Sequence, residues 1–235
     1  MRIVFAFTGA GHLLKESVEI YEKLAKDHEV TVLLSNASYE VLKMYGLYER
    51  VEKHTGARYC ELETDSNQKY SFPITGRLSL GNYDLLIVSP TTANTVAKIV
   101  YGISDTLVTN AVAQAGKGRV PTLIVPVDIN PGDVDTVLPS KLDLLKCEKC
   151  ESCTSAEVCP ENAIIPHKEI SLLNCVGCKL CKDSCPYDAI SVGQIIQLHM
   201  RDIDIENTNK LKEMELITVL EHPNKIVPYI KDNIL

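Results

Sequence analysis

Eight of the nine cysteines lie within residues 147–185, in two near-copies of one spacing pattern. In each copy, three cysteines are separated by two residues each, and a fourth cysteine follows directly before a proline. The first copy contains Cys147, Cys150, Cys153 and Cys159, and the second contains Cys175, Cys178, Cys181 and Cys185. This pattern constrains the fold strongly, because three thiols at such spacing converge on one inorganic group.

The spacing is the signature of ferredoxins with two 4Fe–4S clusters. In that arrangement the close triple binds one cluster, and the remote cysteine before proline binds the other. We therefore predict one cluster bound by Cys147, Cys150, Cys153 and Cys185, and a second bound by Cys175, Cys178, Cys181 and Cys159. The gap before Cys159 is five residues instead of three, which predicts a bulged loop.

Zinc and disulfide bonds are the alternatives. Structural zinc sites usually pair two Cys-x2-Cys units, and this chain has a triple followed by Cys-Pro. The N-terminal residues, MRIVFAFTGAGH, are typical of a buried strand that enters a glycine turn, so we expect no secretory segment. Disulfides then fit poorly, because they persist in oxidising compartments.

The length and composition leave room for one further domain. The cysteine segment takes about fifty residues, and the rest suffices for a domain of ordinary size. No apolar run approaches the ~20 residues of a membrane span. The net charge of −7, without a basic cluster, argues against nucleic-acid binding. We expect a cytoplasmic protein under reducing conditions.

Up to about residue 140, apolar runs alternate with segments of helical periodicity. We predict strands at 2–8, 29–34, 84–88 and 121–127, and helices from Leu13 to about Lys26, after Asn36 to about Tyr45, from Thr91 onwards and over 105–116. Residues 48–83 predict only an edge strand and a long loop. Such alternation predicts an α/β fold, a Rossmann-like or flavodoxin-like parallel sheet with helices on both faces.

The same alternation returns after the last cysteine. It predicts a strand at 194–200, a helix at 204–214, a strand at 216–219 and a short helix at 222–231. We therefore predict that a two-cluster module, residues 146–192, is inserted into one α/β domain made of residues 1–145 and 193–235. The alternative is a separate C-terminal subdomain, but about forty residues would make a poor core alone.

Three predicted turns follow strands and carry small or hydroxyl residues: 8–11, 35–36 and 89–95. In an open parallel sheet, ligands bind at the carboxyl ends of the strands, near the switch point of strand order. Backbone N–H groups at helix N-termini suit a phosphate there. Taken alone these turns are weak evidence, because Ser or Thr after a strand is more often only an N-cap.

Residues 89–109, SPTTANTVAKIVYGISDTLVT, resemble the Pro-Ala-Ser-Ala-Asn-Thr segment and its continuation in the FMN-binding, cysteine-decarboxylase-like flavoproteins. Residues 7–11 (FTGAG) and 34–37 (LSNA) resemble the phosphate-binding turns of that family. Residues 198–223 resemble its archaeal branch, the archaeoflavoproteins. The resemblance covers nearly all of 1–140 and 193–230.

This resemblance implies that the FMN phosphate contacts Thr8, Gly9, Gly11 and Ser35, and that the ribityl chain and isoalloxazine ring contact Thr91, Thr92, Asn94 and Thr95. Members bind FMN at a trimer interface, which implies a homo-oligomer built from trimers. The decarboxylases carry a catalytic His shortly before the strand that leads into the Asn motif. Residues 74–84 contain no His, so we assign no catalytic residue. We interpret His12 and His54 as surface or helix-start residues; the alternative for His12, which follows the glycine turn, is an approach to the phosphate. We interpret Cys60 as a buried structural thiol.

Clusters supply single electrons, whereas a flavin can deliver two as hydride. The combination predicts an oxidoreductase that passes electrons from reduced ferredoxin, or a similar one-electron donor, through two clusters to FMN. The resemblance implies that hydride then goes to a C=N bond of a pterin, dihydromethanopterin, giving tetrahydromethanopterin. The alternatives are an electron-transfer flavoprotein with a protein acceptor and an FMN-dependent decarboxylase.

Overall fold

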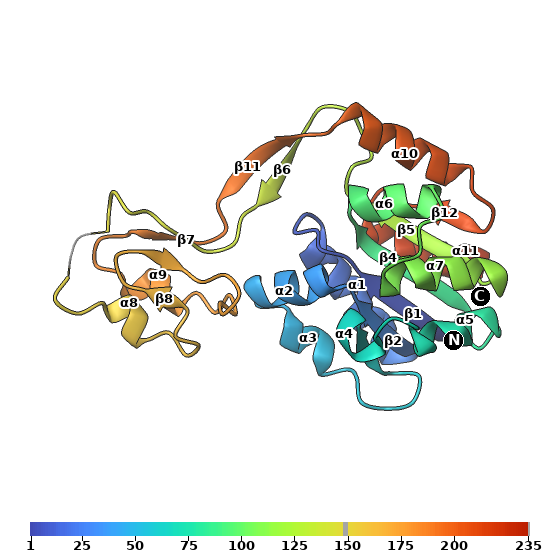
Figure 1. Cartoon of the computed structure of the whole chain (residues 1–235), viewed down its shortest axis with the longest axis horizontal. Coiled ribbons are helices and arrows are strands. Elements are labelled where there is room, and N and C mark those ends of the chain that lie inside the picture. Colours follow the sequence, from blue (N-terminus) through green and yellow to red (C-terminus); the bar gives the residue numbers. More distant parts are fainter. Residues whose placement is uncertain (148–149, 235) are drawn as a thin grey trace.

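Six parallel strands form the central sheet, in the order β12-β5-β4-β1-β2-β3 (Figure 1). The computed structural model describes residues 1–147 and 150–234; the predicted module and tail also include residues 148–149 and 235, which lie outside the described residues. The strands are β1 (Arg2–Phe7), β2 (Glu29–Leu34), β3 (Leu62–Thr64), β4 (Leu85–Thr91), β5 (Thr122–Pro126) and β12 (Ile217–Val219). The predicted α/β class with a parallel sheet is confirmed.

Helices cover both faces of this sheet. They are α1 (Leu14–Asp27), α2 (Asn36–Met44), α6 (Ala93–Val100), α7 (Leu107–Lys117), α10 (Asp202–Lys212) and α11 (Ile226–Asn233). Successive side chains of a strand point to opposite faces. Accordingly, Ile3 and Phe5 pack in the core cluster that contains α1 and α11, and Val4 packs in the cluster that contains α6 and α7. Both of these groups of apolar side chains are buried, and their packing holds the ends of the strands in fixed positions.

Strand β4 differs from its prediction. It does not end at residue 88 but continues through Ser89 and Pro90 to Thr91, and α6 begins at Ala93 instead of Thr91. Pro90 has no N–H to donate, but its carbonyl oxygen accepts from the Thr8 N–H at 3.3 Å and the Thr8 hydroxyl at 2.8 Å. Pro90 is therefore hydrogen-bonded to the turn after β1 through its carbonyl group.

The long loop predicted within 48–83 was also wrong. Edge strand β3 is present, but four short helices accompany it: α3 (Tyr48–Glu52), α4 (Asp65–Gln68), η1 (Pro73–Thr75) and α5 (Gly76–Ser79). Cys60 is only partly buried in this region, in a backbone bridge with Ala57, so the prediction of a buried thiol was wrong. Short polar helices of this kind have no long apolar periodicity for sequence analysis to detect.

A two-stranded antiparallel ribbon connects the sheet to a smaller part of the molecule (Figure 1). The ribbon pairs β6 (Asp133–Val137) with β11 (Ile195–His199), so the predicted strand at 194–200 lies outside the central sheet. Beyond it, residues 141–191 form what we call the cysteine lobe. Its elements are β7 (Lys141–Leu142), α8 (Thr154–Glu157), β8 (Ile164–Ile165), β9 (Glu169–Ile170), α9 (Leu180–Ser184) and β10 (Ile190–Ser191).

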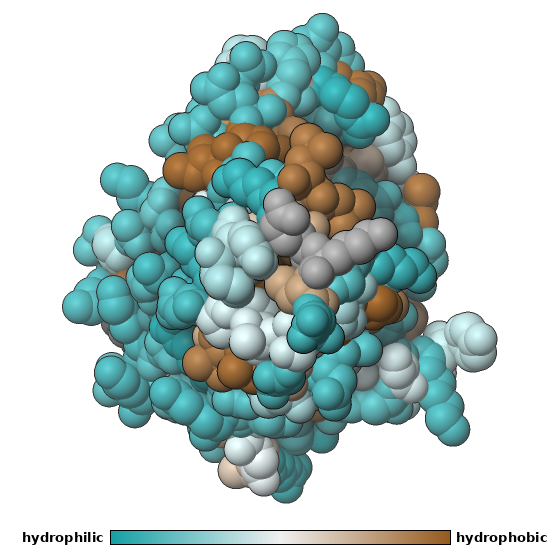
Figure 2. Space-filling view, turned by 90° about the vertical axis from the view of Figure 1, so that its left-hand side faces the viewer, coloured by the Kyte–Doolittle hydropathy of each residue, from teal (hydrophilic) through white to brown (hydrophobic). Residues whose placement is uncertain are grey.

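The cysteine lobe lies between two strands of the central sheet in chain order. Strand β5 precedes the lobe and β12 follows it, yet Thr122 of β5 pairs with Ile217 of β12. Figure 2 looks onto the end of the molecule that carries the lobe, where apolar side chains are exposed among polar ones. Leu145 and Leu173 of the lobe are exposed, as expected for a lobe too small to bury all its apolar surface. Within the described part of the chain, no helix has the length and apolar character needed to cross a membrane.

Candidate functional site

The carboxyl ends of β1 and β4 meet at the switch point of strand order, because β2 and β3 lie on one side and β5 and β12 on the other. Thr8 joins the two turns there: its hydroxyl donates to the Pro90 carbonyl and accepts the Thr92 N–H at 2.9 Å. The Thr8 side chain is 1% exposed. Its hydroxyl therefore shapes the site from within the protein.

A cavity of about 320 Å³ opens at the carboxyl ends of these strands, and we call it the switch-point cavity. It is lined by the turn after β1, the start of α6, the turn after β5 and the ribbon; the residues are Ala10–His12, Thr92–Asn94, Val127, Asp128, Val134, Thr136, Leu198 and Met200. Ligands of open α/β sheets bind in this position. The ribbon thus forms one wall of the cavity and also leads to the cysteine lobe.

Three of the eight residues predicted to contact FMN line this cavity: Gly11, Thr92 and Asn94. Asn94 is exposed there, so its amide is available to a ligand. Thr92 caps α6 by accepting the Thr95 N–H at 3.3 Å, which fixes the helix N-terminus toward the cavity.

The other five are Thr8, Gly9, Ser35, Thr91 and Thr95, and they do not line the cavity. Ser35 caps α2 by accepting the Ser38 N–H at 3.1 Å, and the Thr91 hydroxyl donates to the Val88 carbonyl at 2.8 Å. A Cβ on Gly9 would lie 2.6 Å from Ala37 Cβ, so Gly9 lets the turn after β1 approach α2. These residues hold the walls of the site in place.

Asp128 is a titratable group of the cavity that the sequence analysis did not single out. Its half-buried carboxyl has a raised pKa, first because of burial and second because of the negative charge of Asp204. A backbone hydrogen bond from Ala93 and the positive charge of Arg201 oppose this rise. The sequence signal was its position, two residues after the last residue of β5, at the same edge as the three predicted turns.

The eight motif cysteines surround two separate cavities in the lobe. The first cysteine cavity is lined by Cys147, Cys150, Cys153 and Cys185, and the second by Cys159, Cys175, Cys178 and Cys181. The fourth cysteine of each motif thus lies with the triple of the other motif. This is the grouping that the spacing predicts.

Hydrogen bonds link the two motifs and order the turns after their fourth cysteines. Helix α8 lies beside α9, where the Ser155 hydroxyl donates to the Cys181 carbonyl at 3.0 Å. The sulfur of Cys159 accepts the Ala163 N–H at 3.3 Å, and the sulfur of Cys185 accepts the Ala189 N–H at 3.4 Å, so both halves repeat one bond. The five residues before Cys159 contain α8, so the predicted bulged loop is a helical turn.

Both cavities disfavour uncompensated negative charge on their cysteines. Burial and the neighbouring thiols Cys153, Cys150 and Cys185 raise the pKa of Cys147. Burial and Cys175, Cys178 and Cys159 likewise raise the pKa of Cys181. Metal binding offsets the repulsion between such close thiolates.

The cysteines surround these cavities without meeting at a point. Among residues 1–147 and 150–234, no three His, Cys, Asp or Glu side chains are placed to hold a single metal ion.

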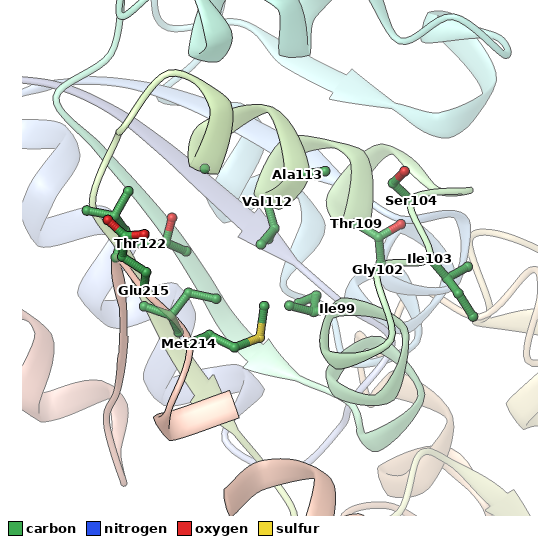
Figure 3. A pocket seen from close by; sticks show the side chains of 13 residues that line it. Ile99, Gly102, Ile103, Ser104, Thr109, Val112, Ala113, Thr122, Met214 and Glu215 are labelled. Carbon is green, nitrogen blue, oxygen red and sulfur yellow. The ribbon is translucent and has the colours of Figure 1, made fainter. Parts of the chain in front are cut away.

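Another cavity, of about 210 Å³, lies at the amino ends of strands β5 and β12 (Figure 3). Its lining includes Ile99 of α6, Val112 of α7 and Met214, with Thr122 and Ile217 at the amino ends of β5 and β12. The amino ends of parallel strands are not where such sheets bind ligands. The switch-point cavity is therefore the candidate site.

Two family models match different parts of the chain. A model described as Flavoprotein matches residues 1–166, and a model described as 4Fe-4S binding domain matches residues 169–191. The first match contains the turn after β1, the start of α6 and the turn after β5, which all line the switch-point cavity. The second match contains Cys175, Cys178, Cys181 and Cys185. Both agree with the flavin and 4Fe–4S cofactors that the sequence predicts.

Two similar proteins are called dihydromethanopterin reductase (acceptor). The one from Methanocaldococcus jannaschii is 51% identical, covering 97% of this chain and 95% of its own. The one from Methanosarcina mazei is 44% identical, covering 96% and 97%. Among solved structures, Burkholderia xenovorans DmrB in complex with FMN, described as a cubic protein cage for redox transfer, is 25% identical with a TM-score of 0.64, covering 98% of this chain and 93% of its own.

Proposed function

Because the chain belongs to the flavoprotein family and also carries a 4Fe-4S binding domain, we propose that it is an oxidoreductase that reduces dihydromethanopterin to tetrahydromethanopterin. The electrons come from reduced ferredoxin or a similar one-electron donor. The observation that carries this proposal is the similarity, over almost the whole chain, to two proteins named for that activity.

FMN is the flavin that the switch-point cavity is proposed to hold. FMN would supply hydride chemistry, and each 4Fe–4S cluster would supply one-electron chemistry. The Asn94 amide can donate and accept at once toward the flavin ring, and Gly11 offers a backbone N–H near the start of α1. Behind them, Thr8, Gly9, Ser35, Thr91 and Thr95 position these groups through the contacts described above.

Reduction of a C=N bond consumes a hydride and a proton. The carboxyl of Asp128 is placed to hold that proton, since it lines the same cavity as Asn94. Its raised pKa increases the fraction that is protonated near neutral pH. Val134, Thr136 and Leu198 of the ribbon, with Met200 directly after it, form one wall of the same space.

The eight cysteines of the lobe are proposed to hold two clusters, one in each cysteine cavity. A neighbouring subunit of a trimer-based homo-oligomer is proposed to complete each flavin site. The described assembly of Burkholderia xenovorans DmrB as a cubic cage supports this oligomeric form.

The test is an anaerobic assay of purified protein. We expect about eight iron atoms and one FMN per chain. Ferredoxin oxidation should continue beyond the electrons that fill the clusters and FMN only when dihydromethanopterin is present. Stoichiometric zinc with little iron would contradict the two clusters. If the reduced protein passes electrons to a protein acceptor but never to the pterin, the chain is an electron-transfer flavoprotein; release of CO₂ from a carboxylic acid substrate would instead indicate a decarboxylase.

A further inference from the structure

The loop between Cys175 and Cys178 packs directly on the end of α2. A Cβ on Gly177 would lie 2.6 Å from the backbone nitrogen of Gly46 and 2.7 Å from the Met44 carbonyl oxygen. In the reverse direction, a Cβ on Gly46 would lie 3.0 Å from the Val176 carbonyl oxygen. The two backbones therefore touch without side chains between them, at the place where α2 approaches the lobe in Figure 1.

Tyr45 extends this contact to the switch-point cavity. A Cβ on Gly11, which lines that cavity, would lie 2.7 Å from the Tyr45 hydroxyl oxygen. The same hydroxyl donates to the Val137 carbonyl at the end of ribbon strand β6. Burial raises the pKa of Tyr45, so its phenol stays protonated and remains a donor. The cysteine loop, the end of α2, the ribbon and the cavity wall thus form one continuous set of contacts.

Only the second of the two cysteine cavities borders the contact with the end of α2. The Cys175–Cys178 loop borders the second cysteine cavity, which contains Val176 in its lining. The described residues that line the first cysteine cavity all belong to 142–190, and none of them takes part in the contact with α2. The lobe is therefore docked on the flavoprotein part through its second motif.

We propose that Gly46 and Gly177 are positioning residues that seat the Cys159/Cys175/Cys178/Cys181 cluster next to the flavin, and that the Cys147/Cys150/Cys153/Cys185 cluster is the outer one that meets the electron donor. This inference rests on the proposed function for its cofactors. Each transfer moves one electron, so two equivalents of reduced ferredoxin are oxidised for each flavin that gains two electrons. The protons come from solvent.

The test compares Gly177→Ala with Gly193→Ala in the anaerobic holoprotein. Both positions have positive φ, 63° and 74°, so alanine strains the backbone similarly. On Gly193, however, a Cβ meets nothing closer than Val137 Cγ1 at 3.9 Å. Gly46→Ala is the second variant, because it leaves every residue of the cysteine lobe unchanged and so does not disturb cluster assembly.

Flavin reduction is followed by rapid mixing with dithionite-reduced ferredoxin, and separately by illumination with EDTA, which reduces the bound flavin directly. We expect the ferredoxin-driven rate to fall by about tenfold or more in Gly177→Ala and Gly46→Ala, because small misplacements at a reacting site are costly. Iron content, flavin content and the light-driven rate should match wild type. Hydrogen exchange should increase at residues 44–47 and 175–178. Gly193→Ala should behave as wild type.

An unchanged ferredoxin-driven rate in Gly46→Ala would overturn the proposal, as would an equal fall in Gly193→Ala. These rates need no pterin. If wild-type protein passes no hydride to dihydromethanopterin while the variants behave as expected, the proposed function fails and the seating of the inner cluster stands.

Discussion

Asp128 is a residue at which the surroundings disfavour the charged form. Burial and Asp204 raise its pKa above the value in the unfolded chain, so the folded protein binds the proton more tightly. The stability that this proton contributes is therefore complete at acidic pH and is lost as pH rises through the raised pKa. At neutral pH the ionised carboxylate is a cost to the fold.

Asp128→Asn keeps an oxygen that accepts from Ala93 and removes the charge. We expect the variant to be more stable than wild type at neutral pH and to lose this advantage at acidic pH, as measured by thermal unfolding across pH. Pterin reduction should fall while FMN content and ferredoxin-driven flavin reduction stay normal, because only the proton source is lost. A variant with wild-type turnover would exclude Asp128 as that source.

Asn94 is the second residue with a testable role. Asn94→Leu removes an amide from the cavity wall, and we expect FMN to bind about five- to tenfold more weakly, since one hydrogen bond contributes roughly 1 kcal/mol. The measurement is titration of the flavin-free protein with FMN. Asn209→Leu, at an exposed position of α10 outside the cavity, is the control. Equal affinities in both variants would mean that the flavin binds elsewhere.

At the scale of the elements, close approach between turns decides the shape of the site. Gly9→Ala places a Cβ 2.6 Å from Ala37 Cβ, so the turn after β1 must move away from α2. We expect a loss of about 1–3 kcal/mol of stability and weaker FMN binding, measured by urea unfolding and flavin titration.

Gly116→Ala is the matched control on α7, where a Cβ has nothing within 4 Å. Alanine in a helix is favoured over glycine by roughly 0.5–1 kcal/mol, so this variant should be slightly more stable than wild type. If Gly9→Ala is as stable as Gly116→Ala, the turn after β1 is not held against α2.

At the scale of the whole molecule, the ribbon leads us to expect that the cysteine lobe can be removed without unfolding the rest. The Leu138 N–H donates to the Gln194 carbonyl at 2.7 Å, so the segment that enters the lobe is hydrogen-bonded to the segment that leaves it. Deleting residues 139–193 and joining Leu138 to Gln194 through Asn-Gly should close a hairpin. Because β5 and β12 still pair, we expect a folded protein that binds FMN and contains no iron.

This deletion tests the predicted insertion of the two-cluster module, which stays a prediction until then. Circular dichroism, flavin content and iron analysis are the measurements. An unfolded or flavin-free product would mean that the lobe is part of the folding unit. The deleted protein should also accept electrons from light and EDTA but not from reduced ferredoxin.

The sequence by itself determined the parts that depend on short-range pattern. The Cys-x2-Cys triples and the Cys-Pro pairs predicted which thiols group together, because a few residues of spacing decide which sulfurs can converge. Helical and strand periodicity located α1, α7, β1, β2 and β5, since each buries one face or is buried throughout. The resemblance of residues 89–109 predicted the start of α6 as a ligand-binding segment, and Asn94 lines the cavity there.

Only the tertiary structure decided which residues line the switch-point cavity. The Thr8 hydroxyl forms hydrogen bonds with the Pro90 carbonyl and the Thr92 N–H, and the Ser35 hydroxyl accepts the Ser38 N–H. These bonds depend on strand order and turn geometry that no local pattern encodes. Asp128 joins the site because β5 lies beside β4, and the ribbon joins it because β6 pairs with a strand about sixty residues later in the chain. The contact between Gly46 and Gly177 links segments even further apart, so it exists only once both parts have folded.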